Sequence, residues 1–576
     1  MVRADRPDVL VVGAGPVGLT AAGELRRRGV SCRIVDRLTT PQPYAKAIGI
    51  QPRTLEMWDR AGMVREMLDA AVPLRGQLTY ADGVERARIE LVLPPEVPYG
   101  FAALPQYETE RVLAAHLARF GTRVERGVGL VSFTQDGQGV TSRLTGPSGR
   151  DEELRTRYLV GCDGAHSTVR KALGLGFDGG AFPAAYMLAD VVLDWDLPPG
   201  YAVRASRAGA DGTDDLLVCV PLPGPGRYRV SMVAPPELAG RRGPEGGDGV
   251  AHGLDGGTGP GLDDVQRVLD RLSPRPVTAS AARWSSVFRI SHRIVDRYGD
   301  GRVLVAGDAA HIHPPTGAQG MNTGIQDAVD LAWKIAMALE GAAPAGLVDG
   351  YDTERRPVGE EVVGRTVRHA TEGVGADPDD PRTVLLREAQ LLVSYRGSPL
   401  VGPPDPDGDG PQPGDRAPDC AGLTRDIAAY PLRLYDLLRE RDHVLVLYGN
   451  PESGVGADGD PLAEPAGAAR AASRGLLHIC LVLADGDPAP GTRLPVLRDT
   501  RGEFARQYGA RKPTAFLIRP DGYLAARISP PSAPELLDRL SGYFGSSGSF
   551  GSSGSFGSSG SFGSFGSFGS SGTFGT

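Results

Sequence analysis

The sequence is poor in cysteine, with five in 576 residues. They lie far apart, form no Cys-x-x-Cys pair and lack the spacing of metal ligands, which argues against a disulfide framework and a zinc site. This usage is typical of a reducing compartment, so we predict a cytoplasmic protein. The five are Cys32, Cys162, Cys219, Cys420 and Cys480.

The sequence also lacks long apolar runs. None approaches the ~20 residues needed to cross a bilayer, and the N-terminus has no signal-peptide core before an apolar strand begins at 8–12. The net charge of -8 argues against nucleic acid or a membrane surface as partner, because both require a basic face. A chain of this length is expected to form two or three domains.

What the sequence does contain is a stretch at 302–334 that joins a short apolar run, an irregular loop and an amphipathic helix. The run Val303–Ala306 is predicted to be a buried strand. The glycines of Gly320–Gly324 let the backbone come close to a ligand, and the start of a helix can bind negative charge. Taken alone, this pattern also fits a strand–helix turn in any α/β enzyme.

The N-terminus has a second pattern of this kind. Gly13, Gly15 and Gly18 follow the strand at 8–12 in a G-x-G-x-x-G spacing and open a helix of small residues. The next strand, predicted at 31–35, ends at Asp36, whose carboxylate can accept bonds from ribose hydroxyls. The pattern predicts a dinucleotide-binding domain for NAD or FAD. A second contact stretch about 300 residues later favours the longer FAD.

Three motifs together resemble a known family. GAGPVGL at 13–19, DGAHSTVRKALG at 163–174 and GDAAHIHPPTGAQGMNTGIQDA at 307–328 are similar to those of the class A FAD-dependent aromatic monooxygenases, whose prototype is para-hydroxybenzoate hydroxylase. Within this family the chain is most similar to the aromatic-polyketide hydroxylases of the angucycline, tetracenomycin and rifampicin type.

The resemblance implies an enzyme that hydroxylates a polycyclic aromatic polyketide in antibiotic biosynthesis. FAD would be the cofactor, NADPH or NADH the reductant and molecular oxygen the co-substrate, through a flavin C4a-hydroperoxide. Baeyer–Villiger or ring-opening oxygenation stays open, and so does a flavin reductase or dehydrogenase without oxygen insertion. A non-catalytic flavin protein that recruits a partner is the alternative from another class.

The resemblance also implies roles for single residues. Asp308 would bind the ribityl chain, and Pro314 would pack over the reacting face of the flavin. The amides of Gly320, Met321 and Asn322 would stabilise the reduced ring. Further cofactor contacts are implied for Gly13, Gly15, Pro16, Val17, Gly18, Asp36, Arg37, Lys46, Gln106, Arg111, Val128, Asp163, Gly164 and Gly307. No metal ligands are expected.

Two positions depart from the family pattern. Lys46 stands where an arginine is usual, so it keeps the charge and loses the bidentate fork. Asp330 stands where an amide is usual and is expected to alter one local hydrogen bond.

Four further polar residues have a functional and a structural interpretation. Arg53 is either a cation on the substrate side or one on a helix surface, and Arg170 either steers a nucleotide phosphate or is a solvated helix cation. His311 and His313 could relay a proton, but structural roles are favoured for both.

The predicted fold class is α/β, with a Rossmann-like FAD-binding domain, an antiparallel-sheet substrate domain and a C-terminal thioredoxin-like domain. The FAD-binding domain is expected at 1–75, 106–176 and 291–374, and the substrate domain at 76–105 and 177–290. Strands of the substrate domain are predicted at 76–80, 87–92, 186–193, 215–221, 227–233 and 282–290, with a mobile loop at 237–261.

The C-terminal part is less regular. Residues 375–415 are dense in proline, aspartate and glycine and are predicted to be a linker. Residues 416–544 have a thioredoxin-like order of elements without a Cys-x-x-Cys pair, so a structural role such as homodimer contact is expected. The tail 545–576 is built from glycine, serine and phenylalanine and is expected to be disordered.

Overall fold

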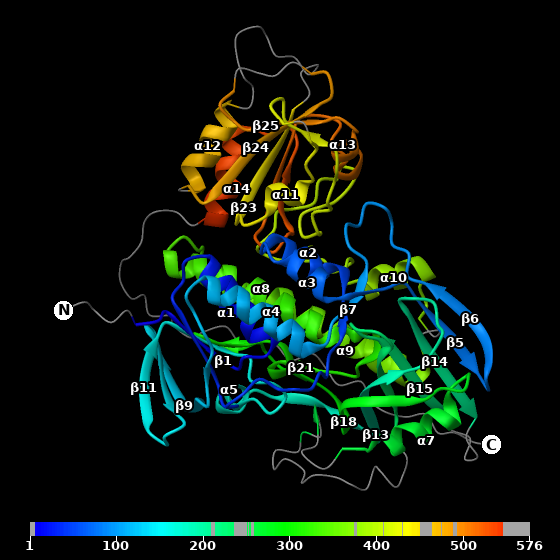
Figure 1. Cartoon of the computed structure of the whole chain (residues 1–576). Coiled ribbons are helices and arrows are strands. Elements are labelled where there is room, and N and C mark those ends of the chain that lie inside the picture. Colours follow the sequence, from blue (N-terminus) through cyan, green and yellow to red (C-terminus); the bar gives the residue numbers. More distant parts are fainter. Residues whose placement is uncertain are drawn as a thin grey trace, which may run out of the picture. The chain divides into compact units, whose positions relative to one another are not determined.

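A computed structural model of the chain (Figure 1) provides the structure. The predicted disordered tail lies outside the described residues, and so does most of the loop predicted at 237–261. The structure describes residues 6–208, 214–234, 250, 253–254, 259–373, 377–406, 408–428, 430–449, 463–473, 475–487 and 492–544.

In the first sheet, β1 (Val9–Val12) lies between other strands on both sides, and all four of its side chains are buried. The order is β19-β20-β12-β1-β2-β8, and β1 pairs in parallel with both β12 and β2. The other strands of this sheet are β2 (Cys32–Asp36), β8 (Glu125–Arg126), β12 (Tyr158–Gly161), β19 (Gly299–Asp300) and β20 (Val303–Val305). The strands predicted at 8–12, 31–35 and 303–306 are confirmed within a residue.

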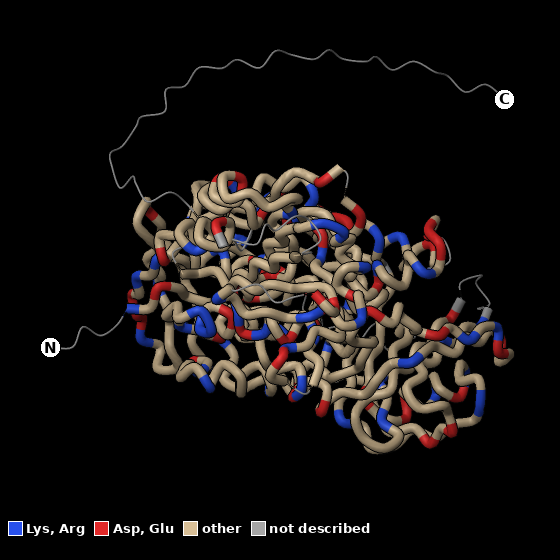
Figure 2. Tube along the Cα trace, turned by 90° about the horizontal axis from the view of Figure 1, so that it is seen from above, with Lys and Arg blue, Asp and Glu red and all other residues tan. Residues whose placement is uncertain are grey.

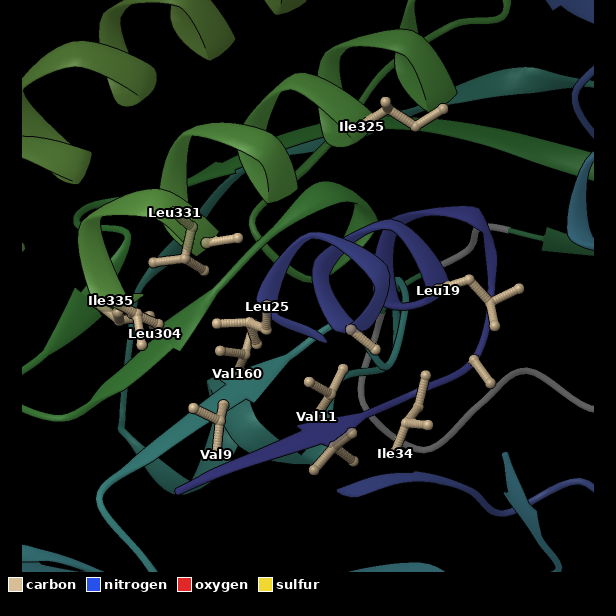
Figure 3. Close-up of a cluster of buried hydrophobic side chains, with 14 of the residues drawn as sticks. Val9, Val11, Leu19, Leu25, Ile34, Val160, Leu304, Ile325, Leu331 and Ile335 are labelled. Carbon is tan, nitrogen blue, oxygen red and sulfur yellow. The ribbon is translucent and has the colours of Figure 1, made fainter. Parts of the chain in front are cut away.

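Helices α1 (Pro16–Arg27), α4 (Gln106–Arg119) and α8 (Gln319–Glu340) pack together over this sheet. Proline at the first position of α1 suits a helix start, and the small residues of α1 let it lie close to the strands. Figure 3 shows Leu25 of α1 beside Val160 of the sheet, with Leu331 of α8 in the same buried cluster. This contact buries the apolar face of α8 along its length.

The second sheet has the order β17-β18-β13-β16-β15-β14-β5-β6, with β21 paired to β18. It is antiparallel except that β14 runs parallel to β5. Its strands are β5 (Gly76–Ala81), β6 (Val84–Glu90), β13 (Phe177–Leu193), β14 (Tyr201–Ala208), β15 (Asp214–Pro221), β16 (Arg227–Val233), β17 (Gly253–Leu254), β18 (Ala279–Val295) and β21 (His311–Ile312). Each of the six predicted strands overlaps an observed strand, with bounds that differ most for β6, β13 and β18, whereas β14, β17 and β21 were not predicted.

One face of the second sheet is covered by α7 (Leu262–Leu272), which was not predicted. Its buried residues recur at helical spacing, which is typical of an amphipathic helix. The glycine-rich segment just before it made this pattern hard to recognise in the sequence. The apolar core between α7 and the sheet includes Leu78, Met187, Val203, Leu217, Val230 and Leu269. Side chains that alternate with these strand residues therefore point to the opposite face.

The remaining elements of this part of the chain form two three-stranded sheets and several helices. They are β3 (Gly49–Ile50), α2 (Pro52–Arg60), α3 (Val64–Ala70), β4 (Val72–Leu74), β7 (Phe101–Ala103), β9 (Gly129–Asp136), β10 (Gly139–Thr145), β11 (Asp151–Thr156), α5 (Thr168–Ala172) and α9 (Gly350–Glu372). Basic and acidic residues are interspersed along the trace (Figure 2), and many of them form ion pairs. No described helix is long and apolar enough to cross a membrane.

The C-terminal unit is a sheet with the order β22-β25-β24-β23-β26-β27. Strands β23, β24 and β25 are parallel, and β26 and β27 form an antiparallel hairpin. Its elements are β22 (Leu423–Thr424), α11 (Leu434–Leu438), β23 (His443–Gly449), α12 (Ala463–Ser473), β24 (Leu477–Ala484), β25 (Val496–Asp499), α13 (Glu503–Tyr508), β26 (Thr514–Ile518), β27 (Leu524–Ile528) and α14 (Ala533–Phe544). Cys420 and Cys480 are both free and buried.

The segment 375–415, predicted to be a linker, is structured in its described part. The segment contains α10 (Pro381–Glu388), and Ala389, Gln390 and Tyr395 are buried. Gln390 Nε2 donates to Gln319 Oε1 at 2.8 Å and to Thr323 Oγ1 at 3.0 Å, so the segment is bound to the start of α8. The proline and aspartate content marked the cap of α10 at Asp380 rather than a chain without structure.

Candidate active site

The loop between β1 and α1 is built around three glycines with different surroundings. A Cβ on Gly13 would lie 2.3 Å from the carbonyl oxygen of Cys162, and one on Gly18 would lie 1.9 Å from that of Gly13. Gly15 has no atom within 4 Å of its Cβ position. The first and third glycines are therefore required by packing, whereas the second borders open space that an approaching ligand can use.

Asp36, at the end of β2, is bonded to this loop. Its Oδ2 accepts from the Ala14 N–H at 2.8 Å, and its Oδ1 accepts from the Leu38 N–H at 2.8 Å. The Val128 N–H donates to the backbone carbonyl of Asp36 at 3.0 Å, which places Val128 beside the same strand end. Arg37, the next residue, is exposed. The predicted residues Asp36, Arg37 and Val128 thus lie together beside the glycine loop.

The three motifs converge on one region although they are far apart in sequence. A Cβ on Gly307 would lie 2.8 Å from Val17 Cγ2, and one on Gly324 would lie 2.7 Å from the same atom. Gly13 is in equally close contact with Cys162 and Asp163. The loop after β1, the turn after β12 and the start of α8 therefore share one edge of the first sheet.

Asn322 fixes the start of α8 with four hydrogen bonds. Its Oδ1 accepts from the Gln51 N–H at 3.0 Å and from Thr54 Oγ1 at 2.8 Å. Its Nδ2 donates to the carbonyls of Gly49 at 2.9 Å and Ala318 at 2.8 Å. Since the side chain is fully committed and buried, the backbone N–H groups of the first turn of α8 are the donors that remain for a ligand.

Lys46 and Asp308 lie opposite each other, with Lys46 Nζ 3.3 Å from Asp308 Oδ2. Gln106 holds the next residue, because its Oε1 accepts from the Ala47 N–H at 3.2 Å. Arg111 is different: its side chain is 61% exposed on α4, where Nε donates to Glu108 at 2.7 Å. Lys46, Gln106 and Asp308 thus lie close together, and Arg111 lies on a solvent-facing side of its helix.

Asp163 caps α5 and is not left as an exposed carboxylate. Its Oδ2 accepts from the N–H groups of Thr168 at 2.6 Å and Val169 at 3.2 Å. Gly164 follows with a φ of 79° and open space at its Cβ position. Burial raises the pKa of Asp163, and the hydrogen bonds oppose that shift. Both residues shape the turn that faces Gly13.

Arg170 and Arg53 are both buried, so neither is a solvated or helix-surface cation. Arg170 is buried and donates to the carbonyls of Ala309 at 3.2 Å and Ala165 at 2.7 Å, which links two of the motifs. Arg53 is also buried, with Nη1 2.8 Å from Glu56 Oε2 and Nη2 donating to the carbonyl of Asp521. These roles could not be predicted from the sequence, because most of the partners are backbone carbonyls and Asp521 lies 468 residues from Arg53.

Asp327 holds the loop that carries Pro314. Its Oδ2 accepts from His311 Nε2 at 2.8 Å and from the Gly307 N–H at 3.2 Å, and its Oδ1 accepts from Arg355 Nε at 2.8 Å. Burial opposes ionisation, but Arg355 and His311 outweigh it and hold the pKa of Asp327 below its usual range. His311 therefore has the structural role that was favoured for it.

His313 is buried next to the start of α8. Its Nδ1 donates to the carbonyl of Pro314 at 2.9 Å, and a Cβ on Gly320 would lie 3.2 Å from its Nε2. Burial, with a smaller contribution from His311, lowers the pKa of His313 to about 4. The ring is therefore neutral near pH 7 and lies beside the backbone of Gly320.

The buried neutral state of His313 predicts a pH dependence of stability. The unfolded chain takes up a proton at about pH 6.5 and the folded chain at about pH 4, so stability falls as pH drops between these values. We expect His313→Asn to reduce the pH dependence of the unfolding free energy in this range by about 1.4 kcal/mol per pH unit, which corresponds to the uptake of one proton. Urea unfolding at several pH values measures it, and an unchanged slope would refute the assignment.

The second sheet contributes a face of mixed polar and aromatic character. Arg229 Nε donates to Asp190 Oδ1, and Trp284 Nε1 donates to Asp190 Oδ2 at 2.8 Å. Arg229 Nη1 lies 3.4 Å from the carbonyl of Lys46, which connects this face to the Lys46–Asp308 pair. Arg229 Nη2 is buried and has no hydrogen-bond partner in the described structure.

The same face carries aromatic residues. Tyr186 and Phe288 lie with ring centroids 5.7 Å apart, and Leu188 and Ile290 complete a small apolar cluster. Arg229 and Asp190 were not predicted from the sequence. Period-two alternation in Arg227–Val233 was the available signal, because it sets the charged residues of this strand on one side and Tyr228, Val230 and Met232 on the other.

A comparison with known protein families decides the assignment. The family model described as "FAD binding domain" matches residues 6–244 and 257–366. The chain belongs to this FAD-binding family. It is 33% identical over 557 residues to a 12-dehydrotetracycline 5-monooxygenase/anhydrotetracycline 6-monooxygenase of Streptomyces rimosus subsp. rimosus, covering 94% of this chain and 99% of that protein.

Other proteins similar to this chain are also named as monooxygenases or hydroxylases. A rifampicin monooxygenase of Streptomyces venezuelae is 38% identical over 67% of this chain and 75% of its own length. Among solved structures, a ternary complex of aklavinone-11 hydroxylase with FAD and aklavinone superposes with a TM-score of 0.72 at 27% identity, covering 94% and 99% of the two chains. OxyS anhydrotetracycline hydroxylase from Streptomyces rimosus gives 0.68 at 30% identity, covering 94% and 100%.

The residues present fit FAD. Open space at Gly15 suits a pyrophosphate, and the first-turn N–H groups of α8 suit an electron-rich ring. The glycine loop and α8 meet through the Val17 contacts with Gly307 and Gly324, so both ends of an extended dinucleotide find donors at one sheet edge. The predicted glycines of the three motifs therefore lie near one edge of the first sheet, whereas Arg111 is exposed to solvent on α4.

Proposed function

We propose that this FAD-dependent monooxygenase hydroxylates a polycyclic aromatic polyketide, with NADPH or NADH as reductant and molecular oxygen as co-substrate. The observation that carries the proposal is that Arg229 joins the aromatic face of the second sheet to the Lys46–Asp308 pair of the FAD site. Relatives named for tetracycline, rifampicin and aklavinone chemistry support a large phenolic substrate.

Bound FAD would supply oxygen activation and transfer; the chain supplies binding, orientation and exclusion of water. The glycine loop would hold the pyrophosphate at Gly15, and Asp36 would face the adenosine ribose. Asp308 would bind the ribityl chain. The Gly320, Met321 and Asn322 amides would stabilise negative charge on the reduced ring, since they are fixed before the reaction begins.

On the substrate side, the chain would place the aromatic ring against the flavin. Pro314, whose carbonyl accepts a hydrogen bond from His313, would form a wall between the loop and the cofactor. The cluster of Leu188, Phe288 and Ile290 would exclude water from the reacting atoms. Arg229 Nη2, as a buried donor without a partner, would bind a phenolate or carbonyl oxygen of the substrate.

We also propose the division of the chain into domains. Strands from 1–75, 106–176 and 291–374 share the first sheet, which supports one FAD-binding domain, and strands from 76–105 and 177–290 share the second, which supports a substrate domain. The C-terminal unit at 416–544 is proposed to be thioredoxin-like, supported by its parallel β25-β24-β23 core and β26–β27 hairpin.

The function is tested by measuring NADPH and NADH oxidation by the FAD-loaded enzyme with a panel of compounds. We expect tetracyclic and angular phenols to stimulate oxidation strongly, whereas a monocyclic phenol and a polycycle without hydroxyl groups should have little effect. Stimulation by the monocyclic phenol alone would contradict a large substrate. No stimulation by any phenol would contradict the function.

Arg229 provides a specific prediction about the substrate. Arg229→Lys keeps a cation for Asp190 and removes the Nη2 donor, so KM for the best phenol should rise about 10-fold, the effect of one charge-assisted hydrogen bond. The dissociation constant for FAD should stay within about twofold. Steady-state kinetics measures the first and flavin fluorescence the second; an unchanged KM would refute the role.

A further inference from the structure

The turn between β26 and β27 is buried although its sequence is polar. Arg519, Pro520, Asp521, Gly522 and Tyr523 form it, and the exposed fraction is 0% for Arg519 and Tyr523 and 1% for Asp521. Hairpin turns normally lie at the surface, where water satisfies their backbone groups. In this protein the partners of the turn come from α2 and α9.

One side of the turn is bonded to α8 and α9. Arg519 donates through Nη1 and Nη2 to the two carboxylate oxygens of Glu354, each at 2.7 Å, and lies 3.2 Å from Asp330 Oδ1. Lys334 Nζ bridges Asp330 at 2.6 Å and Glu354 at 2.7 Å. Asp330, the departure from the family pattern, is therefore part of a closed buried network and not a single altered hydrogen bond.

The other side of the turn is bonded to α2. Arg53 Nη2 donates to the carbonyl of Asp521 at 2.7 Å, and its guanidinium lies 4.7 Å from the centre of the Tyr523 ring. Arg60 Nε donates to the carbonyl of Pro520 at 3.0 Å. All nine residues of α2 are buried, so this helix has no freedom to move without breaking these contacts.

The N-terminal end of α2 reaches the start of α8. Thr54, the residue after Arg53, donates through Oγ1 to Asn322 Oδ1 at 2.8 Å, and the Gln51 N–H donates to the same oxygen at 3.0 Å. Gln51 Nε2 donates to the carbonyl of Gly317 at 2.6 Å. Arg53 and Thr54, which are adjacent in α2, thus contact the buried turn 519–523 and Asn322 of α8, respectively. Gln51, at the N-cap of α2, contacts the loop before α8.

We infer that the buried turn 519–523 of the C-terminal unit is a positioning element of the FAD site, acting through α2. By holding Arg53 and Arg60, it holds Gln51 and Thr54, which fix Asn322 and the first turn of α8. The inference rests on the proposed function only for the place of the flavin ring at that turn. It gives the C-terminal unit a role in cofactor affinity besides packing.

The test compares two variants of the full-length chain. Arg53→Lys/Arg60→Lys weakens the contacts between α2 and the turn, and Arg527→Lys is the control. Arg527 lies in β27 of the same hairpin and bonds Asp405 and the carbonyl of Tyr508, but no residue of α2. Both variants replace buried arginine by lysine, so both should lose stability, and only the first should affect the FAD site.

We expect Arg53→Lys/Arg60→Lys to raise the FAD dissociation constant about tenfold and to speed amide hydrogen exchange at 317–324 by a similar factor, within the range of coupling between sites. In Arg527→Lys both quantities should stay within about twofold of wild type. Equal FAD affinity and equal exchange at 317–324 in the two variants would overturn the inference.

Thr54→Val covers the case in which the double variant does not fold. It leaves the contacts of the turn intact and removes one donor from Asn322, so FAD affinity should fall about fivefold while exchange at 514–528 stays unchanged. An unchanged affinity would overturn the link between α2 and Asn322. Because FAD binding is measured without turnover, a failure of the proposed hydroxylation would leave this result interpretable.

Discussion

Gly15→Leu is expected to abolish FAD binding without destabilising the chain. The Cβ position of Gly15 borders open space and its φ of -75° is accessible to any residue, so the fold accepts the new side chain. The side chain would occupy the place of the pyrophosphate. We expect the FAD dissociation constant to rise at least about 100-fold, which is about 3 kcal/mol, with an unchanged midpoint of urea unfolding of the apoprotein.

Two other glycines provide the controls. Gly137 also has open space and lies in the turn between β9 and β10, so Gly137→Leu should alter neither stability nor FAD affinity. Gly13→Ala should destabilise the apoprotein, because its Cβ would lie 2.3 Å from the Cys162 carbonyl oxygen at a φ of 100°. Retention of tight FAD binding by Gly15→Leu would show that the dinucleotide lies elsewhere.

Asp327→Asn is expected to cost about 3–5 kcal/mol of stability, the effect of breaking a buried ion pair. The substitution removes the charge that pairs with Arg355 and turns an N–H group toward His311 Nε2 or the Gly307 N–H. Urea unfolding measures the loss. Glu360→Gln, which removes an exposed pair with Arg356 on α9, should change stability by at most about 1 kcal/mol.

The difference between wild type and Asp327→Asn should depend on pH. The pKa of Asp327 lies below its usual range, so the stabilising charge is fully present above about pH 4 and is lost as pH falls through the lower folded value. The two proteins should therefore approach each other in stability under acidic conditions. A difference that stays constant or grows on acidification would contradict the account of this site.

Much of the FAD-binding domain was predictable because its signals are local. The strand at 8–12, the glycine spacing and the helix that follows are each dictated by nearby residues, and the structure confirms them. The parts that were missed depend on context. Helix α7 and strand β14 lie next to glycine-rich or proline-rich segments, and α10 begins at a proline within a stretch that looked like a linker.

The candidate site divides in the same way. Residues that lie in a sequence motif, such as Gly15 and Asp308, could be predicted as site residues from the sequence. The hydrogen-bond partners that hold the site together could not. Asn322 is bonded to Gln51 across 271 residues, and Arg53 to Asp521 across 468. Such pairs leave no periodic or compositional trace, so Arg53 appeared ambiguous until its buried position was known.

Oxygen labelling tests the central claim most directly. The FAD-loaded enzyme is incubated with NADPH, ¹⁸O₂ and the phenol that best stimulates NADPH oxidation, and the product is analysed by mass spectrometry and NMR. We expect one labelled oxygen atom in a new hydroxyl group on an intact carbon skeleton. A labelled ester or an opened ring would contradict hydroxylation, and NADPH consumption without any labelled product would contradict the monooxygenase itself.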